Sequence, residues 1–162
     1  MTLNLDYIPE PLLRFGHEQA LDDPRTGLFL FGPLSEARKP KMMRVGVVGT
    51  PEAISIYREW VRSINRHIPA ARPDALHQAP YPGFEAAFGT TWPEEPIVSI
   101  AISPNDIAKS IRFADRHVAI YETVSLFVEP IRTKLRTDDL VVDVWFIIVP
   151  EDIYLHGRPL SR

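Results

Sequence analysis

Short apolar runs alternate along the chain with segments in which apolar residues recur at helical spacing. We expect strands at Leu28–Phe31, closed by Gly32-Pro33, at Arg44–Val48, at Ile97–Ile102 and at Val141–Val149. The last run does not alternate with polar residues, which is typical of a parallel strand that is covered on both faces. The two buried faces of that strand are expected to be Val144, Phe146 and Ile148, and Trp145, Ile147 and Val149.

Two helical segments follow strands and begin with the same signal, a hydroxyl residue and then proline. Thr50-Pro51 predicts an N-cap and the first residue of a helix that reaches about His67. Ser103-Pro104 repeats this signal, and helical spacing continues as far as Leu135. Proline is unfavourable inside a helix, so Pro130 is expected to kink or break the second segment.

The order strand, helix, strand, helix, strand predicts an α/β domain with a mainly parallel sheet and right-handed crossovers. We expect residues 1–40 to be a lead-in segment with the first strand, and 41–162 to hold the α/β domain. Pro69–Pro96 is expected to be a long loop with one short helix at Glu85–Phe88.

Composition narrows the classes of protein. The 162 residues are 45% hydrophobic and 24% charged, which is typical of a globular domain. Cysteine is absent, which excludes disulfides, thiolate zinc sites and cysteine nucleophiles. The longest apolar run, Val144–Val149, is far short of the ~20 residues that span a bilayer, and Met1–Asp6 lacks a secretory pattern. We therefore expect a cytoplasmic protein with no membrane contact.

Ligands of parallel α/β sheets bind at the carboxyl ends of the strands, and two segments are expected there. The turn Gly49-Thr50-Pro51 is either a plain helix cap or an anion contact through free N–H groups. Glu151 and Asp152 either form a solvated turn, do acid–base chemistry or hold magnesium. Asp143 is expected at the opposite end of its strand, where a structural role is favoured over catalysis.

No pattern indicates an enzyme. The five histidines are scattered without metal-ligand spacing, and no Gly-x-Ser-x-Gly elbow is present. The chain is therefore expected to have no catalytic residues and no metal site.

Three arginines, Arg58, Arg62 and Arg66, recur every four residues on the first long helix and are expected to be exposed. They form either a solvated face or a contact with nucleic-acid phosphates or an acidic partner surface. The net charge of −3 means that any nucleic-acid contact must come from such a local patch.

Several ordered blocks along the chain carry a family resemblance. They are Tyr7-Ile8 with Glu10-Pro11, Leu13 and Phe15; Asp23, Arg25, Gly27-Leu28 and Leu30–Leu34; Gly46–Thr50; Pro82–Ala86 with Phe88; Val124–Phe127; and Val142–Glu151 with Ile153-Tyr154 and Arg158-Pro159. In order and spacing the chain resembles the short prokaryotic Argonautes, from about Tyr7 to Ser161.

The resemblance implies a Rossmann-like three-layer MID domain from a protein in which an inactive PIWI domain follows. Such proteins load a guide RNA, recognise target DNA and act in prokaryotic defence. They pair with an APAZ-containing effector, often a TIR or sirtuin-like domain that degrades NAD. The chain itself then needs no cofactor, and magnesium is an option at the guide 5′ phosphate in the complete protein.

The chain departs from the family because it ends in the middle of a block, before the helix that carries the family's phosphate-binding lysine. We therefore expect a fold that is incomplete at its C-terminus. The matched positions imply Tyr154 as a stacking residue and Arg158 as a phosphate contact, with Thr50 a third candidate. The alternative is a stand-alone Rossmann-like domain or enzyme that binds a small molecule, because fold does not fix function.

Overall fold

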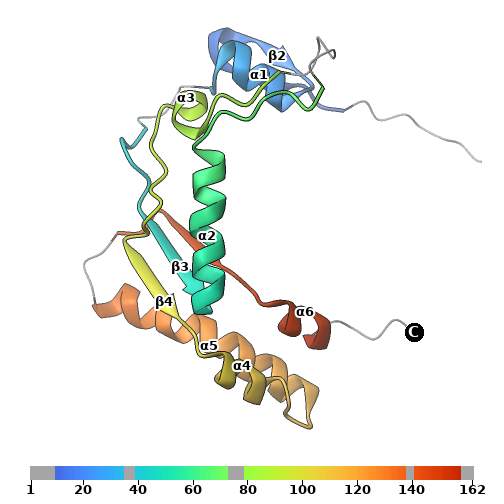
Figure 1. Cartoon of the computed structure of the whole chain (residues 1–162), viewed down its shortest axis with the longest axis vertical. Coiled ribbons are helices and arrows are strands. Elements are labelled where there is room, and N and C mark those ends of the chain that lie inside the picture. Colours follow the sequence, from blue (N-terminus) through green and yellow to red (C-terminus); the bar gives the residue numbers. More distant parts are fainter. Residues whose placement is uncertain (1–9, 35–38, 73–78, 138–140, 158–162) are drawn as a thin grey trace, which may run out of the picture. The chain divides into compact units, whose positions relative to one another are not determined.

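The computed structural model describes residues 10–34, 39–72, 79–137 and 141–157, which form two compact units. The first unit holds the described residues up to Lys41 together with Ile64–Thr91. The second holds Met42–Ser63 and the described residues from Trp92 onward. Figure 1 shows the elements of both units in chain colours.

The first unit contains a small antiparallel hairpin and two short helices. Strand β1 (Leu13–Arg14) pairs with β2 (Ala20–Leu21), and the 3₁₀ turn η1 (Gly16–Glu18) lies between them. Helix α1 spans Pro24–Phe31, and α3 spans Phe84–Phe88, which confirms the short helix expected in the long loop.

The strand expected at Leu28–Phe31 is wrong, because these residues are the last turn of α1. Asp23 caps this helix: its carboxylate accepts hydrogen bonds from the backbone N–H groups of Arg25 and Thr26, at 3.1 and 3.3 Å. Pro24 supplies a fixed φ at the first helical position. The cap therefore decides the conformation of an apolar run that is too short to distinguish helix from strand.

The second unit is built on a three-stranded parallel sheet, which confirms the α/β class. Strand β3 (Val45–Gly49) lies between β4 (Val98–Ala101) and β5 (Val144–Ile147). In the register of the sheet, Val47 lies beside Ser99 on one side and Phe146 on the other. Every residue of β3 is buried.

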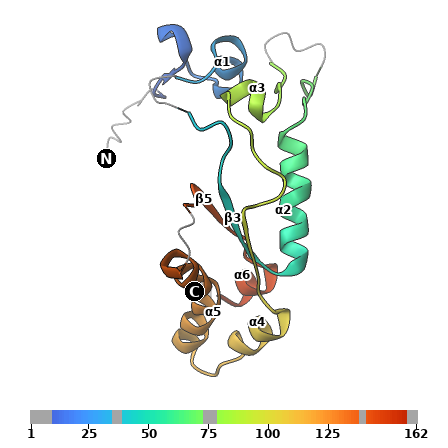
Figure 2. The same cartoon turned by 90° about the vertical axis from the view of Figure 1, so that its left-hand side faces the viewer.

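Helices lie on both faces of this sheet (Figures 1 and 2). Helix α2 (Pro51–Ile64) covers one face, where Tyr57 and Trp60 pack against Phe146. Helices α4 (Pro104–Ser110) and α5 (Arg116–Thr137) cover the other, where Ile107 and Phe127 form a buried cluster with Val48. A seven-residue helix, α6 (Glu151–Gly157), follows β5.

The expectation that the last strand is buried on both faces is wrong. Strand β5 is an edge strand with β3 as its neighbour in the sheet. Trp145 packs against the core on the face that carries α5, but Ile147 and Val149, which lies just past the end of β5, are 46% and 52% exposed. The long apolar run thus marks an edge strand, and the shorter run in β3 takes the centre of the sheet.

The long helical segment does not break at Pro130, where a kink or a break was expected. Helix α5 continues through Pro130 to Thr137, and the break falls at residues 111–115. There the carboxylate of Asp115 accepts hydrogen bonds from the N–H groups of His117 and Val118, which starts α5. Packing of Phe127 and Ile131 against the core stabilises the helix on both sides of the proline.

Candidate functional site at the carboxyl edge of the sheet

The three strands of the sheet converge where β3 ends. The N–H of Ile102, just past β4, donates to the carbonyl of Gly49 at 2.8 Å, and the N–H of Ile148, just past β5, donates to that of Val48 at 2.9 Å. A Cβ atom on Gly49 would lie 3.0 Å from that of Ala53 and 3.2 Å from the carbonyl oxygen of Ile148. Glycine therefore lets the end of β3 approach both the next helix and β5 closely.

Thr50 follows this junction and caps α2. Its hydroxyl accepts a hydrogen bond from the backbone N–H of Ala53 at 3.2 Å, and the residue is half-buried. The helix-cap interpretation is confirmed, and contact with a nucleic acid stays a prediction.

Tyr154 and the two acidic residues lie on α6, directly past the carboxyl end of β5. The Tyr154 side chain is 59% exposed, and Glu151 and Asp152 are exposed in the first turn of the helix. This exposure fits the solvated-turn interpretation of the acids. Arg158 lies outside the described residues.

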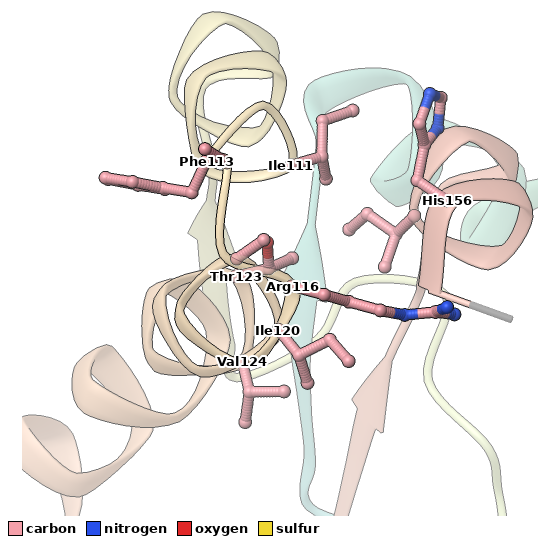
Figure 3. A pocket seen from close by; sticks show the side chains of 10 residues that line it. Ile111, Phe113, Arg116, Ile120, Thr123, Val124 and His156 are labelled. Carbon is pink, nitrogen blue, oxygen red and sulfur yellow. The ribbon is translucent and has the colours of Figure 1, made fainter. Parts of the chain in front are cut away.

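A pocket of about 230 Å³ lies between the α4–α5 turn, the first turns of α5 and α6 (Figure 3). Most of the side chains that line the pocket are apolar, and polar side-chain atoms come from Arg116, Thr123 and His156. Its lining residues are Ile111, Phe113, Ala114, Arg116, Ala119, Ile120, Thr123, Val124, Ile153 and His156. Because α4 follows β4 and α6 follows β5, the pocket belongs to the carboxyl edge of the sheet.

The polar groups of the pocket differ in how they are held. Thr123 is buried, and its hydroxyl hydrogen-bonds that of Ser110 at 2.8 Å, which in turn donates to the carbonyl of Ile107 at 2.9 Å. Nδ1 of His156 lies 2.7 Å from the carbonyl oxygen of Asp152. A carbonyl only accepts, so Nδ1 carries the hydrogen in this contact. Arg116 extends from the start of α5 toward α6 (Figure 3).

Sequence reasoning missed this pocket. Arg116 and His156 are far apart in the sequence, and neither belongs to a recognisable motif. The one usable signal is Asp115, because an N-cap there would have placed Arg116 at the start of a helix at the carboxyl edge.

Arg58, Arg62 and Arg66 do not all lie exposed along one helix, as their four-residue spacing predicts. Helix α2 ends at Ile64, so Arg66 lies past its end. Arg62 and Arg66 are exposed as expected, whereas Arg58 is half-buried. Arg58 pairs with Glu95 and Arg62 with Glu94, and the hydrogen bond that Arg62 donates to the Glu94 carboxylate raises the pKa of Arg62.

Asp143 has the structural role that was expected. At the amino ends of β3 and β5, its Oδ2 accepts from the backbone N–H and Nε of Arg44 at 2.8 and 3.1 Å, and its Oδ1 accepts from a terminal guanidinium nitrogen at 2.6 Å. The side-chain hydrogen bonds from Arg44 are the main reason why the pKa of Asp143 lies below its usual value.

Metal binding and membrane spanning find no support in the described part of the chain. Within it, no group of three or more histidine or acidic side chains lies close enough together to hold a metal ion. None of its helices combines the length and the apolar character that crossing a bilayer requires.

Comparison with known proteins leaves the family open. No protein-family model matches the chain, and no curated protein matches it.

Proposed function

We propose that the chain is a non-catalytic guide-RNA and target-DNA recognition component, the MID region of a short prokaryotic Argonaute. The resemblance of the ordered sequence blocks is its first support. The observation that carries it is the carboxyl edge of a parallel sheet at which Thr50, the exposed Tyr154 of α6 and a partly cationic pocket all lie. This edge is where parallel α/β sheets bind ligands.

In this proposal the three-layer arrangement is Rossmann-like, and each matched residue has a role. Tyr154 stacks on a guide base, because an exposed aromatic ring accepts any base on its face. Arg158 contacts the guide backbone. The hydroxyl of Thr50 lies near the guide RNA while it caps α2.

The effector chemistry belongs to a partner in this proposal. An APAZ-containing protein with a TIR or sirtuin-like domain degrades NAD when the guide meets its target, and the recognition chain catalyses no step itself. No metal ion is needed for the part played by the described residues.

Arg58, Arg62 and Arg66 are proposed to contact phosphates or an acidic face of that partner. In the structure, Glu94 and Glu95 already pair with Arg62 and Arg58. Such a contact therefore exchanges one anionic oxygen for another, which costs less than desolvating a bare guanidinium. Arg66 is exposed beyond the helix end.

The test is purification of the tagged chain from its own cells, followed by sequencing of the nucleic acid that remains bound. We expect short RNA of uniform length. Tyr154→Ala should reduce the recovered RNA several-fold, since stacking contributes about 1–3 kcal/mol per base. Tyr121→Ala is the matched control, because Tyr121 is also exposed but lies on α5.

Absence of RNA from the wild-type chain would contradict the proposal and favour the alternative, a domain that binds a small molecule. Equal loss of RNA in both tyrosine variants would contradict the role of Tyr154.

A further inference from the structure

We infer that the pocket between α5 and α6 binds a small amphiphilic anion, an organic acid whose carboxylate, sulfonate or phosphate group is attached to one or two apolar rings. This inference goes beyond guide recognition, because the pocket would bind such a ligand whether or not the chain holds a nucleic acid. It rests on the size, the lining and the charge of the pocket.

The size of the pocket limits the ligand. Its volume of about 230 Å³ lies below the roughly 300–1,000 Å³ of pockets for drug-sized molecules. The pocket therefore suits a ligand whose apolar part is one or two rings.

The lining determines the chemistry of that body. Seven of the ten lining residues are isoleucine, valine, alanine or phenylalanine. Ile120 and Val124 are 42% and 52% exposed, so a ligand would cover apolar surface that water now touches. Removing such surface from water contributes about 25 cal/mol per Å².

The charge of the pocket determines the sign of the ligand. Arg116 supplies a guanidinium, which binds carboxylates and phosphates in a bidentate way. His156 lies on the opposite wall with its ring oriented by the carbonyl of Asp152. Among the described residues that line the pocket, none is a glutamate or an aspartate.

The backbone of α5 does not provide this selectivity. The carboxylate of Asp115 already accepts from the N–H groups of His117 and Val118 in the first turn. Anion binding therefore depends on the Arg116 side chain, which makes the inference testable by substitution.

The experiment is isothermal titration calorimetry of the full chain with naphthalene-1-sulfonate and its neutral counterpart, naphthalene-1-sulfonamide. We expect the sulfonate to bind at least about tenfold more tightly than the sulfonamide, as a charge-assisted contact predicts. Arg116→Gln should remove that preference, whereas Arg112→Gln should retain it, because Arg112 lies in the turn before α5 and does not line the pocket.

A second pair of variants tests the apolar wall. Ile120→Gln should weaken binding of the sulfonate, and Val118→Gln should not. The two residues lie on the same helix with 42% and 41% exposure, but only Ile120 lines the pocket. Circular dichroism of each variant shows whether it is folded.

Adenosine 5′-monophosphate and adenosine distinguish the source of the ligand. Arg116-dependent binding of the monophosphate would identify nucleotides as one source of the anion, and binding of the sulfonate alone would identify a non-nucleotide acid. Absence of sulfonate binding to the folded wild-type chain, or equal binding of sulfonate and sulfonamide, would overturn the inference. Neither result bears on RNA recovery from cells, so the two proposals fail separately.

Discussion

Arg44 and Asp143 join the first residues of two neighbouring strands through both backbone and side-chain hydrogen bonds. The N–H of Asp143 donates to the carbonyl of Arg44 at 2.8 Å, while the carboxylate of Asp143 receives the backbone N–H and guanidinium of Arg44. Two partners that hold each other at both levels set the register of β3 against β5. The negative charge of Asp143 therefore stabilises the structure, at the end of the sheet opposite the carboxyl edge.

The low pKa of Asp143 predicts how stability depends on pH. A carboxyl group whose folded pKa is below its unfolded value of about 3.9 stabilises the fold above that value, and the contribution is lost as pH falls through the folded pKa. Asp143→Asn should lower the free energy of unfolding at pH 7 more than at pH 2.5 in urea titrations. Glu122→Gln, an exposed change on α5, is the control. An equal loss at both pH values would contradict the ion-pair account.

Gly46 is needed for close packing rather than for an unusual backbone conformation. A Cβ atom there would lie 2.5 Å from the Trp145 ring on the adjacent strand. Gly46→Ala should therefore lower the free energy of unfolding by about 1–3 kcal/mol, the usual cost of overpacking a core. Trp145→Leu in the same chain should recover part of the loss, and Ser99→Ala on β4 serves as the control. An unchanged midpoint in Gly46→Ala would show that the ring moves freely.

At the scale of elements, caps determine the helices more reliably than apolar patterns do. The pair Thr50-Pro51 predicts the start of α2, and the equivalent pair Asp23-Pro24 begins α1 where the apolar pattern predicts a strand at Leu28–Phe31. Both pairs place a side-chain oxygen before proline, and both begin helices in the structure. A four-residue apolar run fits helix and strand equally, so the cap was the deciding signal.

The cap of α2 predicts a specific cost. Thr50→Ala should reduce the free energy of unfolding by about 1 kcal/mol, because the N–H of Ala53 loses its side-chain acceptor. Thr50→Ser keeps the hydroxyl and should stay close to wild type in thermal and urea unfolding. If alanine and serine behave alike, the hydroxyl is not a stabilising cap.

The position of the strands could not be predicted from their composition. Val144–Val149 is the longest apolar run, but the strand that it contains, β5, lies at an edge of the sheet, since pairing order depends on tertiary contacts that an apolar run does not encode. The parallel direction of the sheet did follow from the alternation of strands and helices.

The same substitution in β3 and just past the end of β5 tests this order. Val48→Thr places a hydroxyl in the fully buried centre and should cost about 1–3 kcal/mol. Val149→Thr, at a side chain that is 52% exposed, should change the free energy of unfolding by less than about 0.5 kcal/mol. Equal losses in urea titrations would mean that the edge of the sheet is covered in solution.

At the scale of the whole molecule, the carboxyl edge collects the residues with functional potential. The sequence located Thr50, Glu151 and Asp152 at this edge because strand ends can be read from a pattern, whereas Tyr154 was implied by the family resemblance. It could not locate the pocket, because Arg116 and His156 meet only when α5 returns along the sheet and α6 follows β5. Residues that come together from separate elements show no characteristic spacing in the sequence.

The central claim, that the chain recognises a guide strand at this edge, is tested most directly by ultraviolet crosslinking in the protein's own cells. Mass spectrometry then identifies the crosslinked peptides. The account predicts RNA crosslinks in the peptide that contains Tyr154, with fewer or none in the Leu13–Phe31 region. Recovery of no RNA-linked peptide, or of crosslinks confined to residues outside the carboxyl edge, would contradict it.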